Sequence, residues 1–396
     1  MQGNLLHLYL ACKSSQDIHL RHKYKNLLAI HSFKFDEQRN HNIGLSRKKQ
    51  VELAEVACLE LNEPILVMLD DDLTFESLII KDGYPTKCYP FSYIHEIYLF
   101  AINYPCDVAL GGVTGAPPLP ATSCMRTFLQ DFLGVQSKSK KSEKRWEDAD
   151  YYYDLSETRL CWENWPNSTL TDGSNPVQSA LNQMFHSGPE NRPLVYIPNE
   201  QTPQSRIVRG GNTIVFNPQY LYEIEHPPLP RRGDSIWSIL AKEQGATIME
   251  FPIPLYHTRT SETSVASMQK RPFISSLKKR MSDDLLGASI QRSMLTDEEI
   301  HPIYIGRINR QLNLVEECLE LLQHASQFID DSSESHGYWA MNVKEQGVFE
   351  AVATELLNSL KIELKMKNDL SYETTRYAEH LVRAMRYNYQ ETTEET

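Results

Sequence analysis

Three consecutive aspartates, Asp70, Asp71 and Asp72, follow a short apolar segment in the first quarter of the chain. Residues 65–69 are all apolar, which predicts a buried strand, because a strand covered on both faces loses its polar alternation. Adjacent carboxylates repel one another by roughly 4 kcal/mol per close pair at an effective dielectric of about 20. Asp70 and Asp72 should project to the same side, where they could share one divalent cation. The alternative is a solvated acidic turn that caps a helix.

A cluster of basic residues precedes this acidic segment. Arg47 and the two lysines after it follow Ser46, which we expect to be the N-cap of a helix with regularly spaced apolar residues over 51–59. Cations at the start of a helix oppose the macrodipole. A phosphate or an acceptor bound at Arg47 would explain this unfavourable placement, and chance is the alternative.

Three later segments place polar residues at the ends of predicted elements. Asn212 follows Gly210-Gly211 at the start of an apolar strand, and paired glycines let the backbone approach a ligand closely. Asp234 begins an apolar helix, where it is either an N-cap, contributing about 1 kcal/mol, or a general base. His257 ends a predicted strand, and a lone histidine is more often structural than a ligand.

The remaining pattern predicts an α/β protein with a helical extension. We expect strands at 5–12, 27–33 and 108–112 and a helix at 91–104. After about residue 295, apolar residues at three- and four-residue spacing predict amphipathic helices at 308–329, 348–364 and 372–387. The basic segment 270–280 is expected to link two domains, residues 1–290 and 291–396. The C-terminal helices could contribute acceptor binding or form a homo-oligomer.

Composition excludes several classes of protein. The net charge of −12 argues against a sequence-independent nucleic-acid binder. The seven cysteines are scattered without a C-x-x-C spacing, which indicates neither a zinc knuckle nor a disulfide framework. The chain does not open with a signal-peptide pattern, and its apolar runs are shorter than the ~20 residues of a transmembrane helix. We therefore expect a soluble, cytoplasmic protein with no transmembrane segment and no nucleic-acid partner.

Taken in order, these motifs resemble those of the nucleotide-sugar glycosyltransferases with the GT-A fold, especially the family 2 group. The resemblance covers roughly residues 5–262 and implies a Rossmann-like, mostly parallel mixed sheet flanked by helices. It also implies an enzyme of the hexosyltransferase type, which transfers a sugar from a nucleoside-diphosphate sugar to a hydroxyl of an unidentified acceptor. The cofactor implied is Mn²⁺ or Mg²⁺, which would neutralise the leaving diphosphate.

The resemblance also implies roles for individual residues. Metal ligands would be Asp70, Asp72 and His257; donor contacts would come from Asp70, Asp71, Arg47 and Arg232; acceptor contacts would come from Gly211, Asn212 and Trp237. Asp234 matches the aspartate of the family's Glu-Asp motif, which is the catalytic base in inverting members. This chain has Gly233 before that aspartate instead of glutamate. Asp234 is therefore either the base or a helix cap, and the stereochemistry stays open.

Two other functions are compatible with part of this pattern. A sugar-phosphate nucleotidyltransferase also uses carboxylates after sheet strands, but the glycine-rich phosphate loop expected near its N-terminus does not occur in the sequence. A catalytically inactive relative could act as a scaffold or a carbohydrate-binding protein. Loss of the aspartates or of His257 would favour that alternative, and all of them are present.

Overall fold

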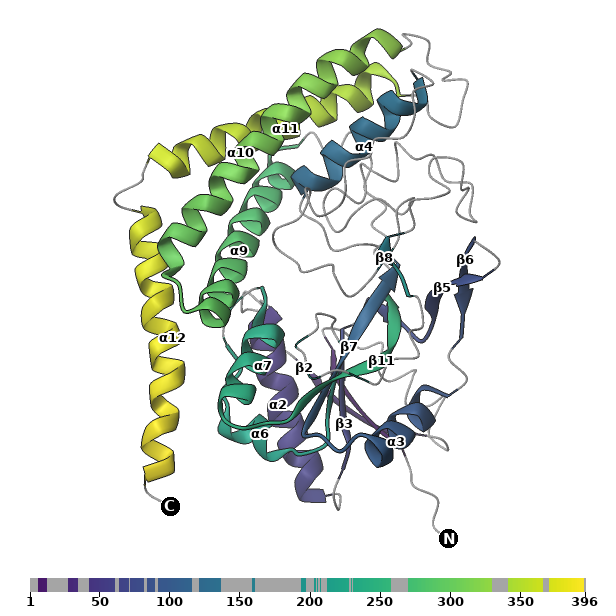
Figure 1. Ribbon diagram of the computed structural model, residues 1–396, viewed down its shortest axis with the longest axis vertical. Helices are drawn as coiled ribbons and strands as arrows, with labels where there is room; N and C mark the ends of the chain where they lie inside the picture. The colour runs from purple at the N-terminus through teal and green to yellow at the C-terminus, as the bar shows by residue number, and fades with distance from the viewer. Residues whose placement is uncertain are drawn as a thin grey trace.

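The computed structural model combines a mixed sheet and its covering helices with a group of long helices (Figure 1). It describes residues 6–12, 28–34, 43–60, 64–70, 72–81, 84–89, 92–115, 121–136, 159–160, 194–196, 203, 205, 207, 212–227, 229, 231–257, 270–329, 341–365 and 370–394. The described part is therefore a mixed α/β structure with helices flanking a sheet, as predicted.

The central sheet has seven strands in the described part of the chain, and five of them follow one another in the order β3-β10-β7-β11-β4. Their bounds are Leu66–Leu69 for β3, Asn212–Val215 for β10, Val108–Gly115 for β7, Ile248–His257 for β11 and Leu73–Thr74 for β4. Strand β10 runs antiparallel to both β3 and β7, whereas β7 and β11 are parallel, so the sheet is mixed. Strand β4 pairs antiparallel with the end of β11.

Six further strands are described, and two of them complete this sheet. Strands β8 (Arg159–Leu160) and β9 (Leu194–Val195) pair with each other, and β9 pairs with the end of β7. Strands β5 (Ser77–Lys81) and β6 (Tyr84–Cys88) form an antiparallel hairpin, whereas β1 (Leu6–Cys12) and β2 (Leu28–Lys34) form a parallel pair. The strands predicted at 5–12 and 27–33 are thus confirmed.

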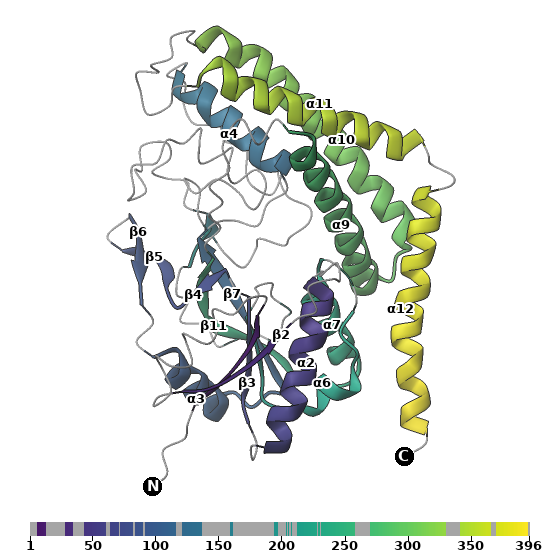
Figure 2. The ribbon, with the colours of Figure 1, turned by 180° about the vertical axis from the view of Figure 1, so that it is seen from behind.

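Strands β7 and β10 are buried on both faces because helices cover each face of the sheet there. Val108 and Val215 pack with α7 (Gly233–Glu243) and α6 (Gln219–Glu223), while their neighbours Ala109 and Ile214 pack with α3 (Tyr93–Asn103). This alternation follows from the period of two along a strand. Figures 1 and 2 show α3 on one side of the strands and α2 (Ile43–Glu60), α6 and α7 on the other.

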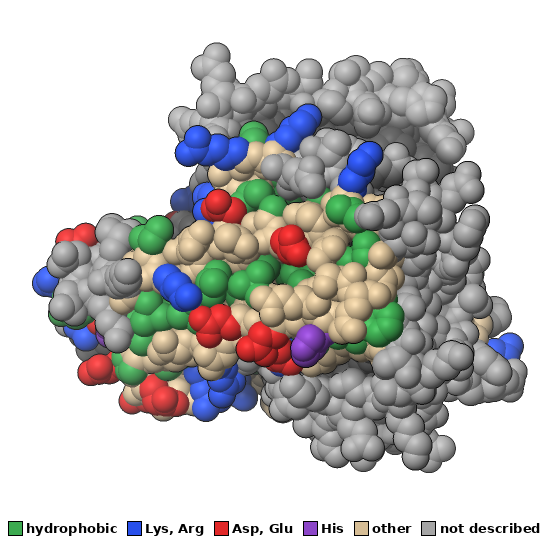
Figure 3. All heavy atoms as spheres, turned by 90° about the horizontal axis from the view of Figure 1, so that it is seen from above, with side chains coloured by type: hydrophobic (Ala, Val, Ile, Leu, Met, Phe, Trp, Pro, Cys, Tyr) green, Lys and Arg blue, Asp and Glu red, His purple; other side chains and the backbone are tan. Residues whose placement is uncertain are grey.

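The long helices form a second apolar core. It is shared by α4 (Ala121–Gln136), α9 (Arg271–Thr296), α10 (Ile300–Ala325) and α11 (Val343–Lys365), and the short 3₁₀ helix Ser326–Phe328 follows α10. Helix α12 (Leu370–Glu394) instead packs through Ala378 and Val382 against the core beside the sheet. Seen from above in Figure 3, acidic and basic side chains are dispersed among apolar ones over the described surface.

Four local expectations differ from the structure. Helix α2 begins at Ile43, so Ser46 lies in its first turn and is not its N-cap. The segment predicted as a link, 270–280, is helical from Arg271 onward, because Leu277 and Met281 bury one side of α9 in the second core. The predicted boundary after residue 290 falls inside this helix. The residues of β3 are half-buried, whereas burial on both faces was expected.

The predicted helix at 91–104, the strand at 108–112 and the three C-terminal helices are confirmed in type and position. Among the described helices, none combines the length and the apolar character needed to cross a membrane.

Candidate functional site

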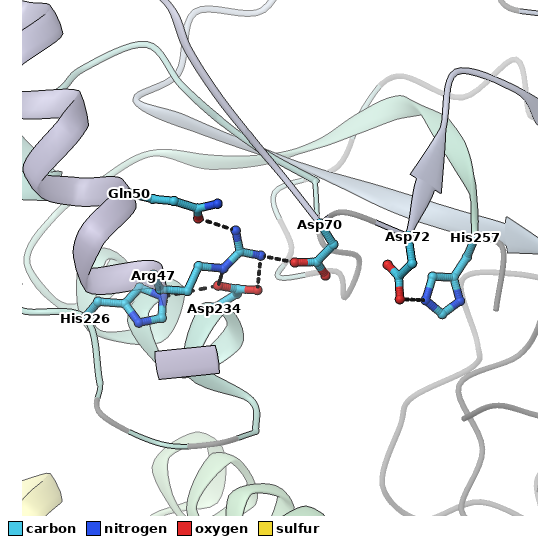
Figure 4. A network of polar contacts seen from close by, with 7 residues as sticks. All are labelled: Arg47, Gln50, Asp70, Asp72, His226, Asp234 and His257. Carbon is cyan, nitrogen blue, oxygen red and sulfur yellow. Dashed lines mark hydrogen bonds and ion pairs between the residues drawn. The ribbon is translucent and has the colours of Figure 1, made fainter. Parts of the chain in front are cut away.

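Arg47, near the start of α2, is the centre of an ion-pair cluster (Figure 4). Its Nη2 lies 2.5 Å from Asp70 Oδ1 and donates to Asp234 Oδ2 at 3.0 Å. Its Nε lies 2.9 Å from Asp234 Oδ1, and its Nη1 donates to Gln50 Oε1 at 2.6 Å. The Arg47 side chain is 4% exposed, whereas those of Asp70 and Asp234 are 28% and 32% exposed. A buried guanidinium therefore joins two acids that solvent can reach.

Each member of this cluster is placed by the end of an element. Asp70 follows the last residue of β3, and Arg47 lies in α2, on the side of the sheet that α7 also covers. Arg232 has a left-handed backbone conformation, with φ of 68°, and α7 starts directly after it. Asp234 thus lies in the first turn of α7, where the positive end of the helix macrodipole favours a carboxylate.

The surroundings shift the pKa values of the two acids in opposite directions. Burial raises the pKa of Asp70, and the neighbouring Arg47 guanidinium only partly offsets this effect. Burial also acts to raise the pKa of Asp234, but Arg47 and a hydrogen bond from His226 outweigh it and lower that pKa below its usual range. Asp234 is therefore ionised at neutral pH, which is the state that a general base requires.

An aspartate–histidine pair, Asp72 and His257, lies beside the cluster. His257 is the last residue of β11 and is opposite Leu73 in the pairing with β4, so it comes next to Asp72. The distance from His257 Nε2 to Asp72 Oδ2 is 3.1 Å. The histidine therefore lies next to one of the two predicted acidic ligands, Asp72.

Asp70 and Asp72 do not project to the same side, contrary to the prediction. The backbone N–H of Leu73 donates to the carbonyl of Asp70 at 3.3 Å, so the strand does not continue from Asp70 to Asp72 and the alternation of a strand does not apply to these two residues. In Figure 4, Asp70 points toward Arg47 and Asp72 points toward His257. Within the described residues, no group of three or more His, Cys, Asp or Glu side chains is arranged to hold a metal ion.

The donor types nevertheless fit a divalent cation. Two neighbouring ligands about 2.1 Å from an octahedral ion lie about 3 Å apart, which is close to the separation in the Asp72–His257 pair. Carboxylate oxygens suit Mn²⁺ and Mg²⁺, and imidazole suits several divalent metals. In this structure Asp70 is held by Arg47 through Oδ1 and does not form one site with Asp72 and His257. Its other oxygen, Oδ2, is the one that a cation could use.

Three other predicted site residues lie in the interior. Asn212 is fully buried, and its Oδ1 accepts a hydrogen bond of 2.6 Å from Tyr93 Oη. Trp237 is 2% exposed and packs in the core beneath the sheet, while Arg232 donates to Gln291 on α9 at 3.0 Å. These surroundings give each residue a packing or structural role, and their contacts with a donor or an acceptor remain predictions. Asp71 and Gly211 lie outside the described residues.

The side chain of the buried Asn212 leaves no space for a Cβ at Gly111 on the neighbouring strand. The two residues are opposite each other in the β10–β7 pairing, and a Cβ at Gly111 would lie 2.1 Å from Asn212 Nδ2. We therefore expect Gly111→Ala to lower the free energy of unfolding by about 1–3 kcal/mol, as overpacked cores do. Urea unfolding checks this, with Gly134→Ala as the control, because a Cβ there meets nothing within 4 Å. Equal stability of the two variants would contradict this packing.

Two members of the cluster, His226 and Gln50, were not predicted from the sequence. His226 Nε2 lies 3.1 Å from Asp234 Oδ1, and Gln50 accepts from Arg47 one helical turn away. The spacing of three residues on a helix could have indicated Gln50. His226 lies eight residues before Asp234, outside any helix or strand, and no local pattern marks it.

The cluster thus offers one ionised carboxylate, a second carboxylate of raised pKa and an Asp–His pair, all near the end of β3. Such a set could accept a proton and hold a cation in neighbouring places. Comparisons of the chain with protein-family models, with curated proteins and with solved structures found no match.

Proposed function

We propose that this chain is a metal-dependent glycosyltransferase with a GT-A type of sheet, which moves a sugar from a nucleoside-diphosphate donor to an acceptor hydroxyl. The observation that carries the proposal is the bridge that Arg47 makes between Asp70 and Asp234, with the Asp72–His257 pair beside it. Sugar transfer needs a charge-neutralising group for the diphosphate and a proton acceptor for the hydroxyl. The site offers residues for both.

The diphosphate side of the reaction belongs to Asp72, His257 and Oδ2 of Asp70. These groups would hold Mn²⁺ or Mg²⁺, which neutralises the negative charge that develops on the leaving diphosphate. His257 is 7% exposed in its side chain, and its pairing with Asp72 holds the two donors at a fixed spacing. The sheet pairing of β4 with β11 maintains that spacing.

The acceptor side belongs to Asp234. As the acceptor oxygen bonds to the anomeric carbon, the bond from that carbon to the diphosphate oxygen breaks, and the leaving diphosphate keeps the electron pair. The hydroxyl proton passes to the Asp234 carboxylate. A carboxylate of low pKa is a weak base, but the hydroxyl becomes strongly acidic as its oxygen bonds to carbon, so a weak base suffices. Arg47 keeps this carboxylate ionised before the reaction.

Thermal melting with Mn²⁺ and a panel of nucleoside diphosphates tests the donor site. A ligand at 100 times its dissociation constant stabilises the folded state by about 2.7 kcal/mol, which a melting shift reports. We expect Asp72→Ala to lose the Mn²⁺-dependent part of the shift, because it removes one of the proposed metal ligands. Asp283→Ala, which removes an acid paired with Lys279 on α9, should keep the shift.

The absence of any shift with every diphosphate would favour a scaffold or carbohydrate-binding protein instead. A normal shift in Asp72→Ala would remove the metal role from that residue. Once a diphosphate is identified, two incubations separate the two candidate reactions. One contains the corresponding sugar nucleotide, and the other contains the nucleoside triphosphate and a sugar phosphate. Release of the nucleoside diphosphate indicates transfer, whereas formation of pyrophosphate from a nucleoside triphosphate and a sugar phosphate indicates a nucleotidyltransferase.

A further inference from the structure

Gly233 leaves space that the ring of His226 fills. A Cβ at Gly233 would lie 2.7 Å from Cε1 and 3.3 Å from Nδ1 of His226. The first of these distances is shorter than real Cβ contacts allow, so any other residue at this position would displace the ring. Gly233 does not have a positive φ, which means that its backbone would accept other residues. The ring of His226 is therefore the reason why position 233 needs a glycine.

His226 directs its ring at Asp234 and is almost fully enclosed. Its side chain is 3% exposed, and its Nε2 lies 3.1 Å from Asp234 Oδ1. An ionised carboxylate has only acceptor sites, so the hydrogen of this contact must be on Nε2 of the imidazole. The donor to Oδ1 of Asp234 is thus His226, which lies in the segment before α7.

Each carboxylate oxygen of Asp234 has one hydrogen-bond donor in the described structure. Oδ1 accepts from His226 Nε2, and Oδ2 accepts from Arg47 Nη2. Arg47 Nε lies 2.9 Å from Oδ1 as an ion-pair contact, without the geometry of a hydrogen bond. His226 therefore holds one oxygen and Arg47 holds the other, which together fix the orientation of the carboxylate, and a lone pair remains on each oxygen. Since the Asp234 side chain is 32% exposed, an acceptor hydroxyl can reach the carboxylate.

We propose that His226 is a positioning residue for Asp234: it occupies the space above Gly233, donates to Oδ1 and thereby holds the carboxylate in the orientation that receives the proton of the acceptor hydroxyl. This inference rests on the proposed function, in which Asp234 accepts the proton. It also explains the Gly-Asp pair of this chain, since the His226 ring fills the volume that a side chain at position 233 would occupy.

Four variants test this role with the sugar nucleotide identified by melting. We expect His226→Ala to lower kcat about tenfold, equivalent to roughly 1.4 kcal/mol, with KM for the donor within about twofold. His226→Gln should recover most of the loss, because its Nε2 can donate to the same oxygen. Gly233→Ala should lower kcat similarly by displacing the ring. The double variant His226→Ala/Gly233→Ala should equal His226→Ala, because no ring remains to be displaced.

Two control variants make the same substitutions elsewhere. His301→Ala removes a histidine on α10 whose hydrogen bond is with Thr375 on α12 and not with a member of the cluster, and Gly306→Ala adds a Cβ that meets nothing within 4 Å. Both should keep the kcat of the wild-type chain. Urea unfolding of every variant shows whether the chain is folded. If His226→Ala does not fold, the comparison of His226→Gln with Gly233→Ala still decides.

Specific results would overturn the proposal. If Gly233→Ala lowers kcat further in the His226→Ala background, the glycine does not serve the ring. If His226→Ala leaves kcat unchanged while Asp234→Asn abolishes turnover, His226 has no positioning role although the proposed function stands. If Asp234→Asn keeps wild-type turnover, the proton acceptor lies elsewhere, and the proposed function of Asp234 and the role of His226 are both wrong.

Discussion

Replacement of Asp234 by asparagine should lower kcat by about 10²–10⁴-fold, which is the usual contribution of a positioned general base. The amide cannot accept the proton of the acceptor hydroxyl at neutral pH. Its Nδ2 would also face Arg47 Nη2, the donor that now binds Oδ2, so one hydrogen bond is lost. Donor binding should persist, because the proposed metal ligands lie at the end of β11 and between β3 and β4, not on α7.

The measurement is the kcat and KM of sugar transfer together with the Mn²⁺-dependent melting shift of the nucleoside diphosphate. A matched control is Asp283→Asn, which makes the same substitution at an acid paired with Lys279 on α9. It should leave kcat, KM and the melting shift unchanged. If Asp234→Asn retains full turnover, Asp234 serves only as the ion-pair partner of Arg47 in the first turn of α7.

Much of the fold could be predicted because most elements depend on residues only a few positions apart. The apolar run of β7 and the periodic apolar residues of α10 and α11 each carry their own signal. The basic composition of 270–280 suggested a link instead. Those charges lie on the solvated side of a helix whose other side, including Leu277, is buried by helices distant in sequence.

Most residues of the candidate site could be predicted from the sequence, but which of them pair with one another could not. The order of the motifs indicated Arg47, Asp70 and Asp234, and the structure brings these three together. Which acid faces which cation depends on the chain after Asp70, where the strand pattern ends. His226 lies on a segment without periodicity, and its role follows only from the space above Gly233.

Replacement of Arg47 by methionine should produce the largest loss of stability among these variants. Methionine retains an apolar, unbranched stem like that of the arginine but lacks the guanidinium group, so Asp70 and Asp234 lose their shared cation. Breaking a buried pair by removing one partner typically costs 3–5 kcal/mol, and partial exposure of both acids places our expectation at about 3 kcal/mol near neutral pH. Urea unfolding measures this difference directly.

The pH dependence of that loss separates an electrostatic cause from a packing cause. In the wild-type chain, the lowered pKa of Asp234 contributes stability above its unfolded pKa of about 3.9, and this contribution is lost as the pH falls through the folded value. The raised pKa of Asp70 acts in the opposite sense, since its burial penalises the ionised form and protonation relieves the penalty. Without Arg47, burial would raise both pKa values, and both acids would then disfavour folding at neutral pH.

We therefore expect the difference in unfolding free energy between the wild-type chain and Arg47→Met to be largest near neutral pH and to shrink as the pH falls toward about 4. Arg386→Met removes the arginine of a half-exposed pair with Glu243 and should cost only about 0–1 kcal/mol, as surface pairs do. A difference for Arg47→Met that is large but independent of pH would mean that its stem packing, and not its charge, stabilises the cluster. In that case the low pKa of Asp234 would need another cause, and the argument that Arg47 prepares Asp234 as a base would fail.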